Sequence, residues 1–326
     1  MKWFSRAPAN IMLLGEHSVV CGHPALACAI DQFMEIEWQA SDDALICIQS
    51  ALADYSFSLQ ELREMPEKVD HPQLRFVIEA LKAFADSLPH GLQIEIRSEF
   101  SSTIGFGSSA AVLAAMLDGL NTICHTKLNR DALFALGHQI ILKIQGRGSG
   151  TDLAASLCGG ILYYQPAIDG QAAVLKTLPE KLSQSLQLTL LYSGYKTPTA
   201  VVLQQVATHW QQQPGLLKNL YDLMGDTTQS ATAALQAGNL QAFFRLGNVY
   251  QGLMDALGVN DAKLSQLVYG LRAIEGMGSA KISGSGLGDC VLGLSNTPVT
   301  LPTALNDYVS FSVKPTPRGA ATETLS

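Results

Sequence analysis

The stretch STIGFGSSAA, residues 102–111, is the most informative part of this chain. Its second half, Gly105 to Ala110, carries two glycines and two serines, and an apolar run typical of a helix follows at residues 112–122. A glycine-rich loop at a helix N-terminus presents free N–H groups and the positive end of the helix dipole to one point. The stretch therefore predicts a phosphate-binding loop, with an ordinary serine-capped turn as the alternative.

Two other nucleotide-binding loops do not account for this stretch. A Walker A loop ends in a lysine, and no lysine follows Ser109 here. The pattern from Gly105 to Ala110 also resembles the dinucleotide-binding fingerprint Gly-x-Gly-x-x-Ala. That fingerprint needs a βαβ unit with an acidic residue about 20 positions further on, and we find no such unit after this loop.

Three further blocks accompany the loop. GRGSGTD (residues 146–152) and SGSGLGDC (residues 283–290) are also rich in glycine, and APANIMLLGEHSVVCGHPALA (residues 7–27) lies near the start of the chain. Together the four blocks resemble the GHMP kinase superfamily, which includes galactokinase, homoserine kinase, mevalonate kinase and phosphomevalonate kinase. The resemblance covers nearly the whole chain, and the opening block is most similar to that of mevalonate kinases.

The resemblance implies a two-domain α+β fold. It implies a ribosomal-protein-S5-like half at residues 1–168, a ferredoxin-like half at residues 169–326, and an ATP cleft between them. The apolar patterns agree with this class, because strands and helices alternate without a regular βαβ repeat. We expect residues 51–70 and the tail from Lys314 to lack regular structure, since both are polar.

Composition excludes several classes of protein. The chain has 326 residues, of which 47% are hydrophobic and 15% charged, as in a globular protein. A net charge of −7 without a basic cluster argues against nucleic-acid binding. The six cysteines form no CxxC pair, and there is no signal peptide and no long apolar run, so we expect a cytoplasmic protein that binds no membrane. A monomer and a homodimer are both open from the sequence.

The resemblance also assigns roles in the phosphate loop. It implies that Gly105, Gly107, Ser108, Ser109 and Ala110 bind ATP, and that the hydroxyl of Ser109 ligates Mg²⁺. Ser108 is expected to cap the helix and to contact phosphate. The alternative is that both serines serve only as helix caps, which stabilise a helix by about 1 kcal/mol.

Asp152 is the candidate catalytic residue. Phosphoryl transfer needs a group that accepts the proton of the acceptor hydroxyl, and an aspartate after a glycine-rich turn can act as that base. The superfamily carries its catalytic aspartate at this place in Ser-Gly-x-Asp, which here reads Ser149 to Asp152. The alternative is an aspartate that caps the following helix.

Two further blocks are expected around the acceptor. Glu16 and His17 match the residues that line the acceptor site of mevalonate kinases, although a surface ion pair would show the same residues. Gly284 and Ser285 belong to a loop that the resemblance places near the active site, in support of the phosphate loop. A plain tight turn is the alternative for that loop.

Two departures distinguish this chain from mevalonate kinases. Asn10 stands where their opening block has a lysine, and a neutral amide cannot stabilise developing negative charge as an ammonium does. Ile141 stands where they carry a metal-ligating glutamate, 11 residues before the catalytic aspartate. Lys196 is a candidate for the missing positive charge on residue type alone.

The opening block favours mevalonate as the acceptor, with ATP and Mg²⁺ as the other requirements. Phosphomevalonate is the alternative, because residues 148–155 and 286–290 resemble phosphomevalonate kinases. A phosphorylated acceptor needs additional cations, for which Lys143, Arg147 and Lys196 are candidates. A nucleotide-binding protein without catalytic activity is the alternative from another class, and the missing lysine and glutamate motivate it.

Overall fold

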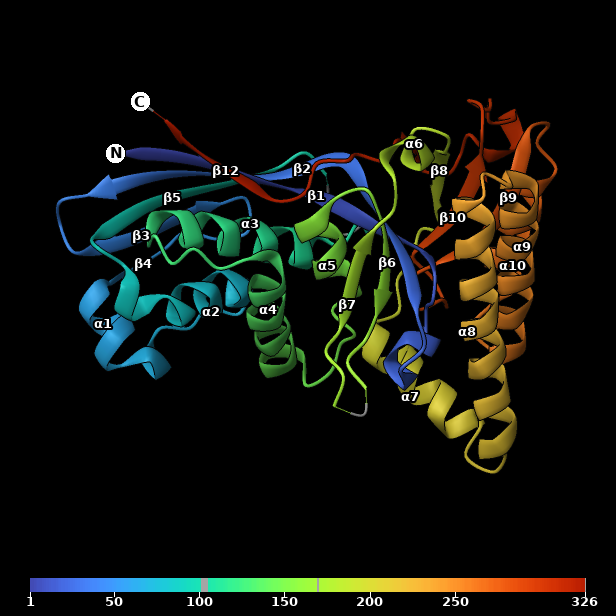
Figure 1. Ribbon diagram of the computed structural model, residues 1–326, viewed down its shortest axis with the longest axis horizontal. Coiled ribbons are helices and arrows are strands. Elements are labelled where there is room, and N and C mark those ends of the chain that lie inside the picture. The colour runs from blue at the N-terminus through green and yellow to red at the C-terminus, as the bar shows by residue number, and fades with distance from the viewer. Residues whose placement is uncertain (101–104, 169, 326) are drawn as a thin grey trace.

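The computed structural model describes residues 1–100, 105–168 and 170–325, which fold into two sheets flanked by helices (Figure 1). The sheets follow one another along the long axis of the molecule, and both chain termini lie at the end of the first sheet. Separate sheets with attached helices confirm the predicted α+β class. Of the predicted phosphate loop, Ser102, Thr103 and Ile104 lie outside the described residues, as does Asp169 at the expected domain boundary.

The first sheet is mostly antiparallel. Its eight described strands are β1 (Lys2–Leu14), β2 (Ala25–Ser41), β3 (Leu45–Ser50), β4 (Tyr55–Ser58), β5 (Gly91–Ser98), β6 (Ile161–Gln165), β7 (Val174–Thr177) and β12 (Ala321–Leu325). The main path is β12-β1-β2-β5-β3-β4, with β6 paired to the start of β2 and β7 paired to β6. Only the β3–β5 pair is parallel among these strands. The alternation expected for residues 34–38 is confirmed, since Met34, Ile36 and Trp38 are buried.

Helices cover one face of this sheet (Figure 1). They are α1 (Leu59–Glu64), α2 (Arg75–Ala83), α3 (Ser108–Ile123), α4 (Arg130–Gln145) and α5 (Thr151–Cys158). α3 lies closest to the sheet, because Gly119 has no side chain at the point where Ser5 of β1 and Trp38 of β2 meet the helix. This close packing positions α3 on the sheet, and with it the N-terminus of the helix, where the phosphate loop ends.

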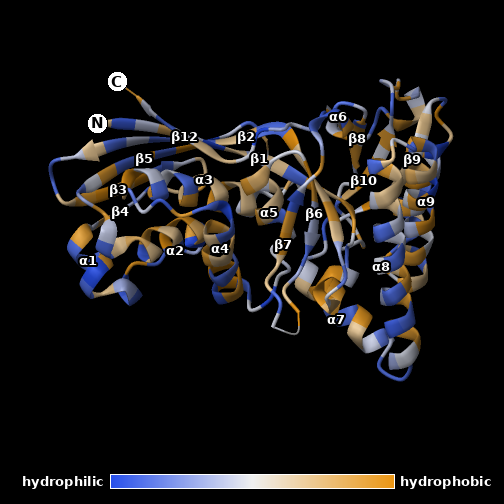
Figure 2. Cartoon of the chain, viewed as in Figure 1, coloured by the Kyte–Doolittle hydropathy of each residue, from blue (hydrophilic) through white to orange (hydrophobic). Residues whose placement is uncertain are grey.

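The second sheet packs against α9 (Leu240–Leu257) and α10 (Ala262–Arg272), and α8 (Pro214–Gln236) packs on α9. Its strands, in the order β11-β8-β10-β9, are β11 (Ser310–Val313), β8 (Gln187–Tyr192), β10 (Cys290–Ser295) and β9 (Met277–Ser283). The remaining described helices are α6 (Glu180–Ser183) and α7 (Thr199–His209). β10 is buried along its whole length, whereas α8 alternates between hydrophobic and hydrophilic residues (Figure 2). Within the described chain, no helix is both long and apolar enough to cross a membrane.

The expectation of an unstructured tail from Lys314 is wrong. The tail returns to the first sheet, where β12 pairs with β1. Thr322 donates its hydroxyl to Asp118 Oδ2 at 2.7 Å, and Arg130 pairs with Asp118 Oδ1 at 2.7 Å while it also donates to the carbonyl of Ala320. These partners are far away in the sequence, so the polar composition of the tail did not reveal them.

The expectation for residues 51–70 is also wrong. This segment contains β4, at the end of the sheet, and the short helix α1. Ser58 and Glu61 form a reciprocal capping box, in which each side chain accepts a hydrogen bond from the backbone of the other residue. Leu59 and Leu62 bury the apolar side of the helix. The Ser-x-x-Glu spacing was therefore a readable local signal within a polar segment.

Candidate active site

The four sequence blocks meet where the first sheet faces the second. Asn10 of β1 donates its backbone N–H to a carbonyl of the phosphate loop at 3.1 Å. His17 Nε2 lies 2.8 Å from the carbonyl oxygen of Ser285, in the loop between β9 and β10. Asp289, at the end of that loop, lies so close to Gly105 that a Cβ on this glycine would overlap its carboxylate. The fold thus brings together segments that are far apart in the sequence.

The phosphate loop ends in a helix N-terminus that no side chain caps. The N-cap of α3 is Gly107, in the left-handed region with φ 66°, so the prediction that Ser108 caps the helix is wrong. The first helical hydrogen bond runs from Ala110 N–H to the Gly107 carbonyl at 3.0 Å. Ser108 and Ser109 precede that bond, and Ser109 is exposed. Their N–H groups are therefore the ones that a helix N-terminus offers to an anion.

The side chain of Asn10, on β1, packs against the phosphate loop. The side chain is buried, and its amide donates to Ser156 Oγ at 3.0 Å. Ser156 in turn donates to the carbonyl of Pro8 at 2.7 Å. A Cβ on Gly107 would overlap the Asn10 amide, so the side chain fills the space between β1, α5 and the phosphate loop. The position of the family lysine is thus occupied by a neutral, hydrogen-bonded group.

Asp152 lies in the first turn of α5. The N-cap of this helix is Gly150, with φ 80° and no side-chain cap, so the alternative in which Asp152 caps the helix is wrong. The preceding loop is held by a hydrogen bond between His138 Nε2 and the carbonyl of Gly148 at 2.8 Å. Thr151 at the start of the helix also donates its N–H to Ser149 Oγ at 3.2 Å. These contacts fix the place from which the carboxylate of Asp152 projects.

The surroundings of Asp152 suit a base. The pKa of Asp152 is raised to about 6, mainly by desolvation and also by the negative charge of Glu16, while the positive charge of Lys196 opposes the shift. The side chain itself is accessible to water, so the desolvation comes from protein atoms that crowd the carboxylate without covering it. A pKa close to the working pH combines an ionised base at neutral pH with a useful proton affinity.

Glu16 is buried rather than exposed. Its Oε1 pairs with the ammonium group of Lys281, a residue of β9 that is also completely buried. Burial raises the pKa of Glu16, while the charge of Lys281 opposes that shift. The alternative of a surface ion pair between Glu16 and His17 is therefore wrong. We did not identify Lys281 from the sequence, although it precedes the third glycine-rich block by two residues.

His17 adopts an unusual backbone conformation. Ser18 N–H donates to the carbonyl of Glu16 at 2.7 Å across His17, which has φ 64° and ψ −55°. This is a γ-turn with positive φ, a rare and strained arrangement that is found mostly at functional sites. Burial lowers the pKa of His17, so the ring is neutral at pH 7. A neutral ring that donates from Nε2 to Ser285 has an unprotonated Nδ1 that accepts hydrogen bonds.

Two hydrogen-bond acceptors of the opening block (residues 7–27) have no partner among the described residues. They are His17 Nδ1 and Glu16 Oε2, and both atoms are buried. Buried polar atoms are usually hydrogen-bonded, so each unpaired atom needs an explanation. A ligand that carries hydroxyl groups would supply the missing donors to both.

The three side chains predicted as candidates to bind the phosphate of a phosphorylated acceptor lie in different parts of the structure. Lys196 Nζ is 3.0 Å from Asp289 Oδ2, beside the phosphate loop. Arg147 donates to the carbonyl of Ala200 at 2.9 Å. Lys143 pairs with a glutamate of α2 at 2.5 Å, on the far side of α4, so its assignment to a phosphate is wrong. Lys196 is therefore the candidate that the fold places next to Asp152.

The oxygen donors at the site fit Mg²⁺. The described residues contain no cluster of three or more His, Cys, Asp or Glu side chains that could hold a metal. Ile141 is buried and packs under Gly148, so it offers no oxygen in place of the family glutamate. Mg²⁺ in kinases needs only one or two protein oxygens, because phosphate oxygens and water complete its octahedron. The exposed hydroxyl of Ser109 meets that requirement together with ATP.

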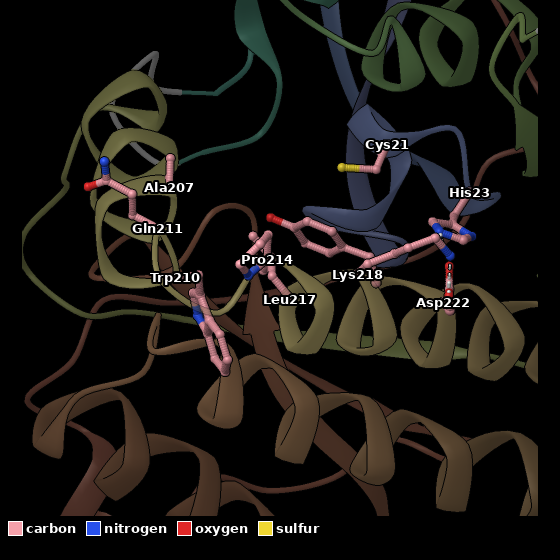
Figure 3. Close-up of a pocket in the computed structure, with 10 residues that line it drawn as sticks. Cys21, His23, Ala207, Trp210, Gln211, Pro214, Leu217, Lys218 and Asp222 are labelled. Carbon is pink, nitrogen blue, oxygen red and sulfur yellow. Dashed lines mark hydrogen bonds and ion pairs between the residues drawn. The ribbon is translucent and has the colours of Figure 1, made fainter.

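A separate hollow of about 560 Å³ lies beside the acceptor block (Figure 3). It is bordered by Cys21 and His23 on one side and by α7 and α8 on the other. His23 Nε2 pairs with Asp222 at 3.4 Å, and Lys218 pairs with the same carboxylate at 2.6 Å. The residues that line it include none of the predicted site residues, so this hollow is not the assembled site.

Several known proteins are similar to this chain in sequence and in fold. Residues 75–160 match the GHMP kinases N terminal domain. The mevalonate kinase of Pyrococcus furiosus is 31% identical over 310 residues, which cover 90% of this chain and 90% of that protein. The structure of the Methanococcus jannaschii mevalonate kinase has a TM-score of 0.79 at 22% identity and covers 96% of this chain and 98% of that chain.

A phosphomevalonate kinase is also similar in structure. The Streptococcus pneumoniae enzyme in complex with phosphomevalonate and AMPPNP has a TM-score of 0.73 at 20% identity, over 90% of this chain and 92% of that chain. Likeness at this level of identity concerns the fold, whereas the 31% identity with the Pyrococcus enzyme extends over nearly the full length of both proteins. This chain therefore belongs to the GHMP kinase superfamily and, within it, to the mevalonate kinase family.

Proposed function

We propose that this protein transfers the γ-phosphoryl group of ATP to the 5-hydroxyl of mevalonate. The observation that carries the proposal is the 31% identity with a mevalonate kinase over 90% of both chains. The geometry agrees, because Lys196 links the two groups: its charge acts on Asp152, and its partner Asp289 lies against Gly105 of the phosphate loop. The two halves of a phosphoryl transfer, an anion site and a base, are thus both present.

Asp152 acts as the base in this proposal. It accepts the proton of the 5-hydroxyl while the oxygen forms a bond to the γ-phosphorus, and the bond between that phosphorus and the bridging oxygen of ADP breaks. The N–H groups of Ser108 and Ser109 hold phosphate oxygens at the N-terminus of α3. Asp152 is about half protonated near pH 6 and ionised above pH 7, so it can accept the proton at neutral pH.

The acceptor lies against Glu16 and His17. Mevalonate carries hydroxyl groups, and the unpaired acceptors Glu16 Oε2 and His17 Nδ1 can each receive a hydrogen bond from one. The ion pair with Lys281 and the γ-turn around His17 hold both residues in place. A preorganised acceptor site of this kind orients the reacting hydroxyl.

Ser109 is the residue that we expect to hold Mg²⁺. When bound, the ion neutralises charge on the phosphate groups of ATP. Gly105 and Gly107 have positive φ values of 73° and 66°, which lets the loop backbone turn toward the phosphates without side chains in the way. Ala110 is buried in the first turn and anchors the helix end.

Phosphomevalonate kinase and a protein that only binds nucleotide remain the competing functions. The test is ADP release with Mg²⁺-ATP and either mevalonate or 5-phosphomevalonate. We expect turnover with mevalonate, and loss of turnover with retained ATP binding in Asp152→Ala. Preferred turnover of 5-phosphomevalonate would assign the other kinase, and ATP binding without turnover of either acceptor would indicate a binding protein.

A further inference from the structure

Lys196 lies beside the phosphate loop although it belongs to the second half of the chain. It follows β8, and its Nζ is 3.0 Å from Asp289 Oδ2. The carboxylate of Asp289 lies directly against Gly105. One carboxylate thus separates the ammonium group of Lys196 from the glycine loop. With 43% of its side chain exposed, Lys196 remains accessible to a ligand in the cleft.

The backbone around this lysine is tightly held. Asp289 donates its N–H to the carbonyl of Tyr195 at 2.8 Å and accepts from Ser193 N–H at 2.9 Å. Thr197 Oγ1 donates to the carbonyl of Leu287 at 2.6 Å. The segment that carries Lys196 is therefore fastened across the loop between β9 and β10. A lysine on such a support loses less entropy when it binds a phosphate than one on a free loop.

Two other cations near the site, and the side chain at the position of the family lysine, have partners among the described residues. The ammonium group of Lys281 is completely buried and paired with Glu16. Arg147 donates to a backbone carbonyl at the start of α7. Asn10, at the position of the family lysine, is neutral and hydrogen-bonded to Ser156. Besides Mg²⁺, a positively charged side chain can stabilise the charge that develops on the transferred phosphoryl group.

We propose that Lys196 supplies that cation, and that it moves from Asp289 to the γ-phosphate of ATP when the nucleotide binds. It would thus replace the lysine that mevalonate kinases carry at the position of Asn10, with the charge delivered from the opposite side of the cleft. This inference rests on the proposed kinase function and adds a residue to it. Asp289 holds the ammonium group beside the loop.

The placement has a second consequence for Asp152. The positive charge of Lys196 favours the ionised form of this carboxylate and opposes the effects of desolvation and of Glu16. Removal of the charge would therefore raise the pKa of the base. The pH profile therefore reports the charge of Lys196 near Asp152, whereas kcat and the affinity for Mg²⁺-ATP report its contact with phosphate.

The test uses Lys196→Gln and Lys196→Arg in the full-length protein with Mg²⁺-ATP and mevalonate. We expect Lys196→Gln to lower kcat by about tenfold to a hundredfold and to move the acidic limb of kcat/KM to higher pH. Lys196→Arg keeps the charge and should restore the acidic limb. Lys82→Gln is the matched control, because Lys82 forms a comparable ion pair with Glu79 at 2.9 Å on α2, away from the cleft.

Thermal melting of each variant shows whether it is folded. The proposal is overturned if folded Lys196→Gln keeps the wild-type kcat and the wild-type acidic limb. If the wild-type protein is inactive with mevalonate, the proposed function fails, and Mg²⁺-ATP binding measured by calorimetry still tests Lys196. Binding about tenfold weaker in Lys196→Gln than in Lys82→Gln would support its contact with phosphate, whereas equal binding would overturn it.

Discussion

Two ion pairs lie near the candidate site, and they differ in how far their side chains are exposed to water. Lys281 is completely buried and the Glu16 side chain is only 3% exposed, so bulk water has almost no access to their pair. Lys196 and Asp289 form the other pair, in which the lysine side chain is 43% exposed and the aspartate 18%. A buried pair holds its residues in position, and removal of either partner leaves an uncompensated charge. The accessible pair can exchange its partner for a ligand.

Burial also shifts the pKa values of residues in both pairs. Burial lowers the pKa of Lys281 and raises that of Glu16, and each partner opposes the shift of the other. Burial also raises the pKa of Asp289, and Lys196 opposes that shift. Asp152 responds to one member of each pair, since Glu16 raises its pKa and Lys196 lowers it. Desolvation is the largest cause of the raised pKa of Asp152, and one member of each pair adjusts it in opposite directions.

Loss of Lys281 should have the largest effect on stability. Lys281→Met leaves the carboxylate of Glu16 buried without its partner, and such a change costs about 3–5 kcal/mol. Urea denaturation at pH 7 measures the loss of unfolding free energy. The matched double variant Glu16→Gln with Lys281→Met removes both charges and should recover most of that loss. A single variant as stable as wild type would show that the buried pair does not hold the site.

The substitution Asn10→Lys, which places the family lysine at position 10, should have an intermediate effect on stability. Asn10→Lys forces a longer, charged side chain into the space beside Gly107 and Ser156, and overpacking of this kind costs about 1–3 kcal/mol. We expect a lower urea midpoint and no gain in kcat, because Lys196 already supplies the charge. A stable variant with a higher kcat would show instead that the cleft lacks a cation.

The smallest effect is expected for Asp152→Asn on stability. Desolvation raises the pKa of Asp152 from 3.8 to about 6, so the folded state binds this proton more tightly than the unfolded state. Stability then falls as the pH rises from about 4 through 6, and the neutral asparagine avoids this loss. Thermal melts should show the variant slightly more stable than wild type at pH 8, with a smaller difference at pH 4.5. An equal difference at both pH values would contradict the raised pKa.

Local patterns predicted much of the fold and of the candidate site. The helices that begin at Ser108 and Arg130 and the strand around Trp38 follow from apolar spacing and glycine boundaries. The glycine-rich loops were readable because positive φ values at Gly107 and Gly150 require this residue. Their convergence on one cleft came from the family resemblance rather than from the pattern.

Contacts between residues that are far apart in the sequence could not be predicted. Glu16 is paired with a lysine 265 residues away, and no local signal reveals that contact. The same holds for the tail, whose strand β12 depends on Asp118 and Arg130 of the N-terminal half. The role of Gly107 as helix cap was missed because Ser108 follows it and serine is a common cap.

The most direct test is the pH dependence of kcat/KM for mevalonate in the wild-type protein and in Asp152→Asn. Asp152 is the base on which both ion pairs act, so its titration reports on the whole arrangement. We expect the wild-type rate to rise with pH through about 6 and to level off above pH 7, and the asparagine variant to lose about 10²- to 10⁴-fold in rate. A variant that keeps the wild-type rate and profile would contradict the assignment of Asp152 as the catalytic base.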